Sequence, residues 1–233
     1  MLVNALLAAL RPRSPERRSL RPGVWHRGKV DAARTVRASM RRMGEPAQVV
    51  YRRRLSKPRR VVLIIDVSGS MSGYAEHLLR LAHRVTHGAR GSVETFTIGT
   101  RLTHLTRALR ARDTEQALGA AGSMMPDWSG GTRLGENLQA FLDRWGRRGM
   151  ARGSVIVIFS DGWESGETAL LAEQTESLAR LSHRLVWVNP HRGKTGYEPL
   201  QQGVKAVLPY VSDFLAGHSL ATYEDVLDVI ANA

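Results

Sequence analysis

The stretch Val61–Ser72 reads VVLIIDVSGSMS, and it joins a run of five apolar residues directly to a cluster of polar ones. A short apolar run that ends in turn residues is typical of a buried strand, most often in a parallel sheet. Ligands of open α/β sheets bind beyond the carboxyl ends of the strands. Asp66, Ser68 and Ser70 are therefore expected at a binding edge, where their hard oxygen atoms suit Mg²⁺ better than a soft metal.

Two more polar segments extend this pattern further along the chain. Thr132 ends the loop Ser129–Thr132, and Asp161 follows the apolar run Val155–Phe159. Together with Asp66–Ser70, these segments resemble the DxSxS-type metal-ion-dependent adhesion site of von Willebrand factor A (VWA) domains. The three parts occur in the right order, each after an expected strand or before an expected helix.

The chain also resembles the CoxE-like branch of this superfamily over about residues 24–225. The likeness rests on four stretches: Phe96–Leu109 (FTIGTRLTHLTRAL), Asp127–Gly135 (DWSGGTRLG), Ser160–Glu164 (SDGWE) and Trp187–Pro190 (WVNP).

This resemblance implies roles for the five polar residues of the adhesion-site pattern. Ser68, Ser70 and Thr132 would bind Mg²⁺ (or Mn²⁺) directly, while Asp66 and Asp161 would act partly through water molecules. An ion held mainly by neutral hydroxyls stays electrophilic, so it can accept a carboxylate from a partner as its last ligand. The site would then serve binding rather than catalysis.

The resemblance also implies a kind of partner. CoxE-like proteins are associated with MoxR-type AAA+ ATPases, and the namesake of the group serves maturation of a molybdenum–copper carbon monoxide dehydrogenase. The expected function is that of a non-enzymatic adaptor that grips the ATPase or a client metalloenzyme through an acidic side chain. Trp128, Trp163 and Glu164 flank the site loops, and we expect them to contact the partner.

An enzymatic alternative uses the same ion as a Lewis acid in a hydrolase or phosphatase. It needs a general base beside the cluster, for which Glu164 is the one candidate in the sequence. The chain has no GxxxxGK[ST], GxSxG or HExxH motif. His83 and His87 are spaced to share one face of a helix, but no third metal ligand accompanies them.

The net charge of +13 lies almost entirely in the N-terminal part. Residues 1–60 hold 17 basic and 3 acidic residues (+14), whereas the remainder holds 17 and 18 (−1). We therefore expect a basic N-terminal arm over residues 1–57, partly helical or extended, and a VWA domain over residues 58–233. A basic arm leaves nucleic-acid binding open as another function. The chain has no cysteine, which fits a cytoplasmic protein, and no apolar run long enough to span a membrane.

From residue 60 onward, patterns typical of strands and helices alternate. They predict an α/β fold: a doubly wound, mostly parallel sheet with one antiparallel edge strand and helices on both faces. The turn Gly99–Thr100 predicts the hairpin that makes this edge. Asp113 is expected to cap one helix, and Thr222 with Asp225 the last one. The N-terminal part has helix patterns over residues 1–10 and 31–43, and Gln48–Leu55 alternates enough for a strand or an extended segment. No strand is predicted before residue 48.

Overall fold

The structure is a computed structural model that describes residues 7, 9–43, 45, 48–89, 91–125, 132–193 and 201–233. The chain forms two compact units, one made of Met1–Pro15 with Arg59–Ala233 and the other of Glu16–Pro58. Within the described residues, no helix is long and apolar enough to cross a membrane.

The larger unit is built on a six-stranded sheet in the order β6-β5-β4-β7-β8-β9. Only β6 runs antiparallel to its neighbour, because it returns from β5 through a hairpin turn. The predicted α/β fold with one antiparallel edge strand is therefore confirmed. The strands are β4 (Val61–Asp66), β5 (Val93–Ile98), β6 (Thr103–His104), β7 (Val155–Phe159), β8 (Arg184–Asn189) and β9 (Asp213–Ala216).

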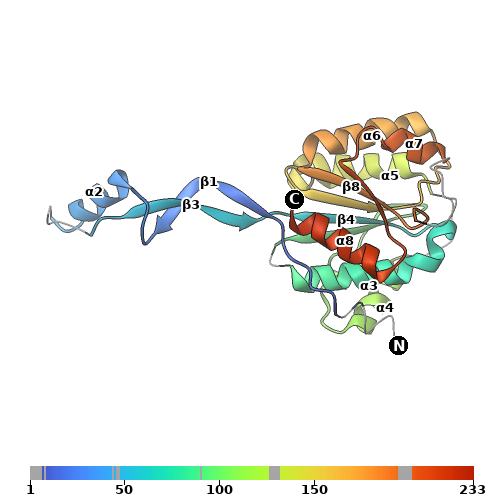
Figure 1. Ribbon diagram of the computed structural model, residues 1–233, viewed down its shortest axis with the longest axis horizontal. Coiled ribbons are helices and arrows are strands. Elements are labelled where there is room, and N and C mark those ends of the chain that lie inside the picture. The colour runs from blue at the N-terminus through green and yellow to red at the C-terminus, as the bar shows by residue number, and fades with distance from the viewer. Residues whose placement is uncertain are drawn as a thin grey trace. The chain divides into compact units, whose positions relative to one another are not determined.

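Helices cover both faces of this sheet (Figure 1). One face carries α3 (Ser72–Gly88), α4 (Thr114–Met124) and α8 (Leu220–Ala231). The other carries α5 (Leu134–Phe141), the π-helical stretch η3 (Leu142–Met150), α6 (Thr168–Leu181) and α7 (Gln202–Val207). Two short 3₁₀ turns complete the unit, η1 (Gly69–Met71) and η2 (Ala108–Arg110).

Strand β4 explains why the sheet is covered on both faces. Successive side chains of a strand point to opposite faces. Val61, Leu63 and Ile65 accordingly pack into the core under α3, α4 and α8. Val62 and Ile64 pack into the core on the other face. A strand that alternates between two apolar cores needs a continuous apolar sequence, which is the pattern that predicted it.

Two helix starts test the capping predictions. Asp113 caps α4 as expected, since its Oδ1 accepts a hydrogen bond of 2.8 Å from Gln116 N. The prediction for the last helix was wrong by three residues, because Ser219 is the cap of α8. Ser219 Oγ accepts from Thr222 N, and Thr222 Oγ1 accepts from Ser219 N at 3.0 Å. Thr222 is thus the inner member of a reciprocal capping box.

The smaller unit is a three-stranded antiparallel sheet in the order β1-β3-β2, with one helix between the second and third strands of the chain. Its elements are β1 (Glu16–Trp25), β2 (Lys29–Val30), α2 (Ala32–Met40) and β3 (Tyr51–Pro58). The helix was predicted, whereas β1 was not, because proline and arginine are poor strand signals. The register of β1 shifts between Arg18 and Pro22, so the proline lies at an irregularity, where its missing N–H is tolerated.

Part of the N-terminal segment packs into the larger unit. Leu7 and Leu10 are both buried in the core beside α3 and α8. Arg84 of α3 also donates a 2.9 Å hydrogen bond to the carbonyl of Leu10. The predicted division into residues 1–57 and 58–233 stays a prediction about domains, but the structure groups residues 1–15 with the larger unit.

The first prediction follows from the place where the chain leaves and re-enters the larger unit. Arg59 N donates to Pro15 O at 2.7 Å, so a short glycine–serine linker can replace Glu16–Pro58. In the described part of that segment no apolar side chain is buried. We expect the deletion variant to unfold cooperatively, at nearly the melting temperature of the full chain, when followed by circular dichroism.

A chain that starts at residue 58 is the comparison. It lacks Leu7 and Leu10, and losing one buried leucine costs roughly 2–5 kcal/mol. We therefore expect it to melt well below the linker variant. Equal melting temperatures for the two variants would show that the N-terminal leucines do not stabilise the core.

Candidate metal-binding site

The candidate site lies at the carboxyl ends of two adjacent parallel strands. Asp66 is the last residue of β4, and Asp161 follows the end of β7 by two residues. Because β4 and β7 pair in parallel, their following loops meet at one edge of the sheet. Thr132 reaches the same place from the segment just before α5.

The carboxylate of Asp66 joins these segments. Its Oδ1 accepts hydrogen bonds from Ser68 N at 2.9 Å and from Thr132 Oγ1 at 3.2 Å. Its Oδ2 accepts one from Ser160 Oγ at 2.6 Å. The side chain is fully buried, and this burial raises the pKa of Asp66 to about 6, although the bonds from Ser160 and Ser68 act in the opposite direction.

Ser68 and Ser70 present their hydroxyls from the turn η1. The two Oγ atoms lie 3.3 Å apart. Ser68 is buried, whereas Ser70 is exposed, so the pair reaches from the interior of the site to its surface. The structure thus brings the hydroxyls of Ser68 and Ser70 beside each other. Ser68 N and the Thr132 hydroxyl both donate hydrogen bonds to Oδ1 of Asp66.

Asp161 is also buried and is held by its own loop. Its Oδ1 accepts a hydrogen bond of 3.1 Å from Trp163 N, and its backbone carbonyl accepts one from Asn189 Nδ2 at 3.1 Å. The other carboxylate oxygen lies 3.7 Å from His191 Nε2.

Sequence reasoning missed Ser160, Asn189 and His191 as neighbours of the site. Ser160 directly precedes Asp161, so its position next to a predicted ligand was an available signal. Asn189 and His191 come from the end of β8, which is the neighbour of β7 in the sheet. Only the strand order places them here.

A second set of contacts ties the Asp161 loop to the segment that carries Thr132. Ser165 N donates to Thr132 O at 3.1 Å. The carboxylate of Glu164 accepts from Gly135 N at 2.8 Å and from Gly166 N at 2.6 Å. Gly135 lies in the first turn of α5, where a negative charge also interacts favourably with the helix dipole.

The same loop packs against the start of α7. The two backbones approach so closely at Gly162 and Gly203 that neither position has room for a Cβ atom. Gly162 has a φ of +78°, a conformation that side chains with a Cβ rarely adopt. A Cβ atom on Gly203 would lie 2.2 Å from the carbonyl oxygen of Gly162. The backbone of this loop is therefore fixed by contact from two sides.

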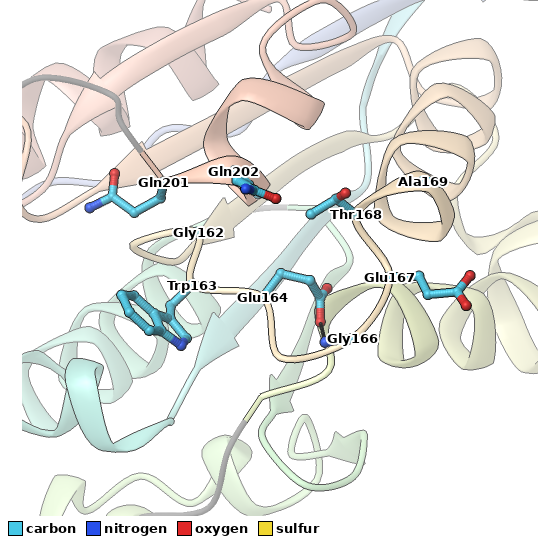
Figure 2. A pocket seen from close by; sticks show the side chains of 10 residues that line it. Gly162, Trp163, Glu164, Gly166, Glu167, Thr168, Ala169, Gln201 and Gln202 are labelled. Atoms are coloured by element: carbon cyan, nitrogen blue, oxygen red, sulfur yellow. Dashed lines mark hydrogen bonds between the residues drawn. The ribbon is translucent and has the colours of Figure 1, made fainter.

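A pocket of about 610 Å³ lies beside this loop, and Figure 2 shows the residues that line it. Trp163 stands at its edge with 64% of its surface exposed. Of the three expected partner-contacting residues, Trp163 and Glu164 line the pocket, while Trp128 lies outside the described residues. The lining residues are Gly162, Trp163, Glu164, Gly166, Glu167, Thr168, Ala169, Gln201, Gln202 and Gly203.

The two helical histidines have other partners. His83 and His87 each place Nε2 within hydrogen-bond distance of the carbonyl of Ala111, at 2.9 and 3.1 Å. Across the described ranges, no three histidine, cysteine or carboxylate side chains gather in a way that could hold a metal.

The oxygen atoms around Asp66 fit a small hard cation. Octahedral Mg²⁺ with its oxygens at 2.0–2.1 Å separates neighbouring oxygens by about 2.9 Å. The Oγ atoms of Ser68 and Ser70, which would both be direct ligands, lie 3.3 Å apart, only slightly more than this spacing. Three hydroxyls and two carboxylates also form the oxygen-only donor set that Mg²⁺ and Mn²⁺ prefer.

Solved structures share this fold. A von Willebrand factor type A protein from Catenulispora acidiphila aligns with a TM-score of 0.54 and 17% identity over 78% of this chain and 44% of that one. Proximal thread matrix protein 1 from the mussel byssus, with a zinc-occupied MIDAS motif, aligns with a TM-score of 0.50 and 13% identity over 74% and 46%. The chain thus spans less than half the length of either protein.

No curated protein is similar enough in sequence to match. The family model described as "VWA domain containing CoxE-like protein" matches residues 2–223, nearly the whole chain. Because this model matches almost all of the chain, and the sheet agrees with that of the solved VWA structure, the chain belongs to the family of VWA domain-containing CoxE-like proteins.

Proposed function

We propose that this protein is a non-enzymatic, metal-dependent interaction module that works as an adaptor for a MoxR-type AAA+ ATPase. Its task would be maturation or metal-centre assembly of a client enzyme. The observation that carries the proposal is the cluster at the buried Asp66 carboxylate, which accepts hydrogen bonds from Ser68 N and Thr132 Oγ1, while the hydroxyls of Ser68 and Ser70 lie 3.3 Å apart. The family, which is that of a VWA interaction domain, supports the same conclusion.

Each polar residue has a distinct part in holding the ion. Ser68, Ser70 and Thr132 would be direct ligands of Mg²⁺ or Mn²⁺, with Asp66 and Asp161 orienting coordinated waters. The bound cation would supply one position that accepts a carboxylate from the partner. The zinc-occupied MIDAS motif of the mussel protein supports a divalent cation at a site of this kind.

The state of the carboxylates supports binding rather than catalysis. Asp66 accepts three hydrogen bonds, and both oxygens of Glu164 are engaged by backbone amides. Glu164, the general base that the hydrolase alternative requires, is therefore occupied in tying two loops together. A carboxylate with this role is poorly placed to take up a proton during turnover.

The exposed aromatic beside the site suggests where the partner lies. Trp163 is the large apolar side chain on the rim of the pocket, and aromatic residues dominate the energetics of many interfaces. We propose that an acidic side chain of the partner completes the metal coordination while neighbouring residues pack on Trp163. The absence of cysteine supports a cytoplasmic setting for this interaction.

Metal binding is tested by titration calorimetry with Mn²⁺. Asp66→Ala should weaken binding roughly 10–100-fold, as is usual when a residue that orients metal ligands is lost. Asp143→Ala is the matched control, because Asp143 is an exposed carboxylate of η3 whose partner is Arg147. Equal affinities for Asp66→Ala and the unmodified chain would contradict the proposed site.

Partner binding is tested with variants of Thr132. Thr132→Ala should abolish pull-down of the MoxR-type ATPase or of its client in a chain that circular dichroism shows to be folded. EDTA leaves the Thr132–Asp66 hydrogen bond intact and should have the same effect on pull-down. Losing a charge-assisted contact at an interface costs roughly 2–5 kcal/mol. Thr132→Ser keeps the hydroxyl and should keep the partner.

Two results would count against this adaptor function. If pull-down survives both EDTA and Thr132→Ala, the interface lies elsewhere. If the chain hydrolyses a generic phosphoester with Mg²⁺, and Asp66→Ala removes this activity, the protein is an enzyme.

Glu164 offers a separate test of how the site is held. Glu164→Ala should weaken Mn²⁺ binding about tenfold, because hydrogen bonds to charged groups contribute roughly 1.5–3 kcal/mol and here they join the two ligand loops. Glu167→Ala is the control, since Glu167 is an exposed neighbour without such a bond. Unchanged Mn²⁺ affinity together with lost pull-down would instead assign Glu164 to the partner interface.

A further inference from the structure

The smaller unit concentrates positive charge. Glu16–Pro58 contains 13 basic and 3 acidic residues (+10), so about a fifth of the chain carries most of its net charge of +13. Among its described residues one ion pair is found, between Arg34 and Asp31. The unit therefore presents cations that its own carboxylates do not neutralise.

Four of these cations line one hollow. Lys29 of β2 and Arg52, Arg53 and Arg54 of β3 surround a groove of about 600 Å³, together with Leu20, Pro22 and Gly28. Within the described ranges, none of the four has a carboxylate in ion-pair distance. A groove with four unneutralised cations favours an anionic occupant.

The same unit also exposes large apolar side chains. No apolar residue in the described part of the unit is buried, so those residues form no hydrophobic core. Leu20 of β1 is 86% exposed, Met40 at the end of α2 is 75% exposed, and Met43 just after that helix is 99% exposed. Exposed apolar side chains gathered in one small unit indicate an interaction surface.

Helix α2 carries both positive charge and exposed apolar side chains, on different sides of the helix. Val36 and Met40 lie one turn apart on one side, and both are exposed. Arg34, Arg37 and Arg41 fall on other sides of the helix by the same spacing. A short basic amphipathic helix with an unpartnered apolar side is typical of segments that lie on a membrane surface.

The charges and contacts of the unit discriminate between possible occupants. A second copy would be repelled by the same excess of positive charge. A nucleic acid offers phosphates but no apolar phase for Leu20 and Met43. The ring of Trp25, which could stack on a base, is 37% exposed and already contacts Arg53, 5.6 Å from its centroid, and the ring of His26, with the centroids 5.0 Å apart.

A folded acidic protein fits less well than a lipid surface. Protein interfaces need apolar groups that match a complementary shape. The exposed apolar residues here come from separate elements, and the hollow of the unit is lined mainly by cations. A fluid bilayer buries such side chains one by one, without a matching shape.

We propose that the unit Glu16–Pro58 binds the surface of an anionic phospholipid bilayer. Its arginine and lysine side chains contact the lipid headgroups, while Leu20, Met40 and Met43 enter the boundary of the acyl region. This interaction goes beyond the metal-dependent adaptor function and does not rest on it. It would hold the adaptor at a membrane without a membrane-spanning helix.

The test is sedimentation of the full chain with vesicles. Vesicles of phosphatidylcholine with phosphatidylglycerol should bind the chain, and vesicles of phosphatidylcholine alone should not. Replacing Arg52, Arg53 and Arg54 by glutamine should weaken binding roughly a hundredfold. Each basic residue near an anionic surface contributes about fivefold in affinity, and three are lost. Met40→Ser with Met43→Ser should weaken it about tenfold through lost apolar burial.

Matched controls come from the larger unit. Replacing the exposed Arg101, Arg107 and Arg110 by glutamine changes the net charge equally, and Met124→Ser removes another exposed methionine. These controls should bind as the unmodified chain does, and equal melting temperatures should show that every variant is folded.

Three outcomes would overturn the proposal. The first is failure of the unmodified chain to bind vesicles with phosphatidylglycerol. The second is binding that the two methionine substitutions leave unchanged, which would indicate a general attraction to polyanions. The third is loss of vesicle binding in the control variants to the same extent, which would place the lipid contact outside Glu16–Pro58.

Discussion

The site depends on one buried carboxylate. Asp66 is removed from water at the end of the central strand and is stabilised there by hydrogen bonds from Ser68, Thr132 and Ser160. A buried carboxylate without such partners would be costly, so these contacts fix the conformation of three separate segments. The same bonds position Ser68 and Thr132, two of the three residues whose hydroxyls could bind a cation. The hydrogen bonds to Asp66 thus contribute both to the stability of the loops and to the geometry of the site.

The surrounding backbone limits how far these segments can move. Glu164 joins the Asp161 loop to the first turn of α5, and the contact between Gly162 and Gly203 joins it to α7. Both contacts act on backbone atoms, which leaves the Trp163 side chain free to face outward. A rigid loop with one exposed aromatic suits recognition of a partner, because little conformational entropy is lost on binding.

The two units differ in what stabilises them. The larger unit has an apolar core on each face of its sheet, extended by Leu7 and Leu10 from the N-terminal segment. The smaller unit relies on strand pairing and on capping by Asp31, whose Oδ1 accepts from Arg34 N. None of its described apolar side chains is buried, and a small sheet without a buried apolar face is marginal in water. An external surface that takes up its apolar side chains would therefore stabilise it as well as bind it.

The sequence by itself determined the α/β class and the central strand Val61–Asp66, and it predicted the five polar residues of the candidate site. Continuous apolar runs and turn residues are local signals, and they do not depend on the rest of the fold. Tertiary structure alone decided that β8 lies beside β7, which brings Asn189 and His191 to Asp161. It also decided that Glu164 binds the amide of Gly135, and that β1 pairs with β3 despite its arginines and its proline. These are contacts between residues distant in the chain, and their energies come from pairing and burial that no single segment encodes.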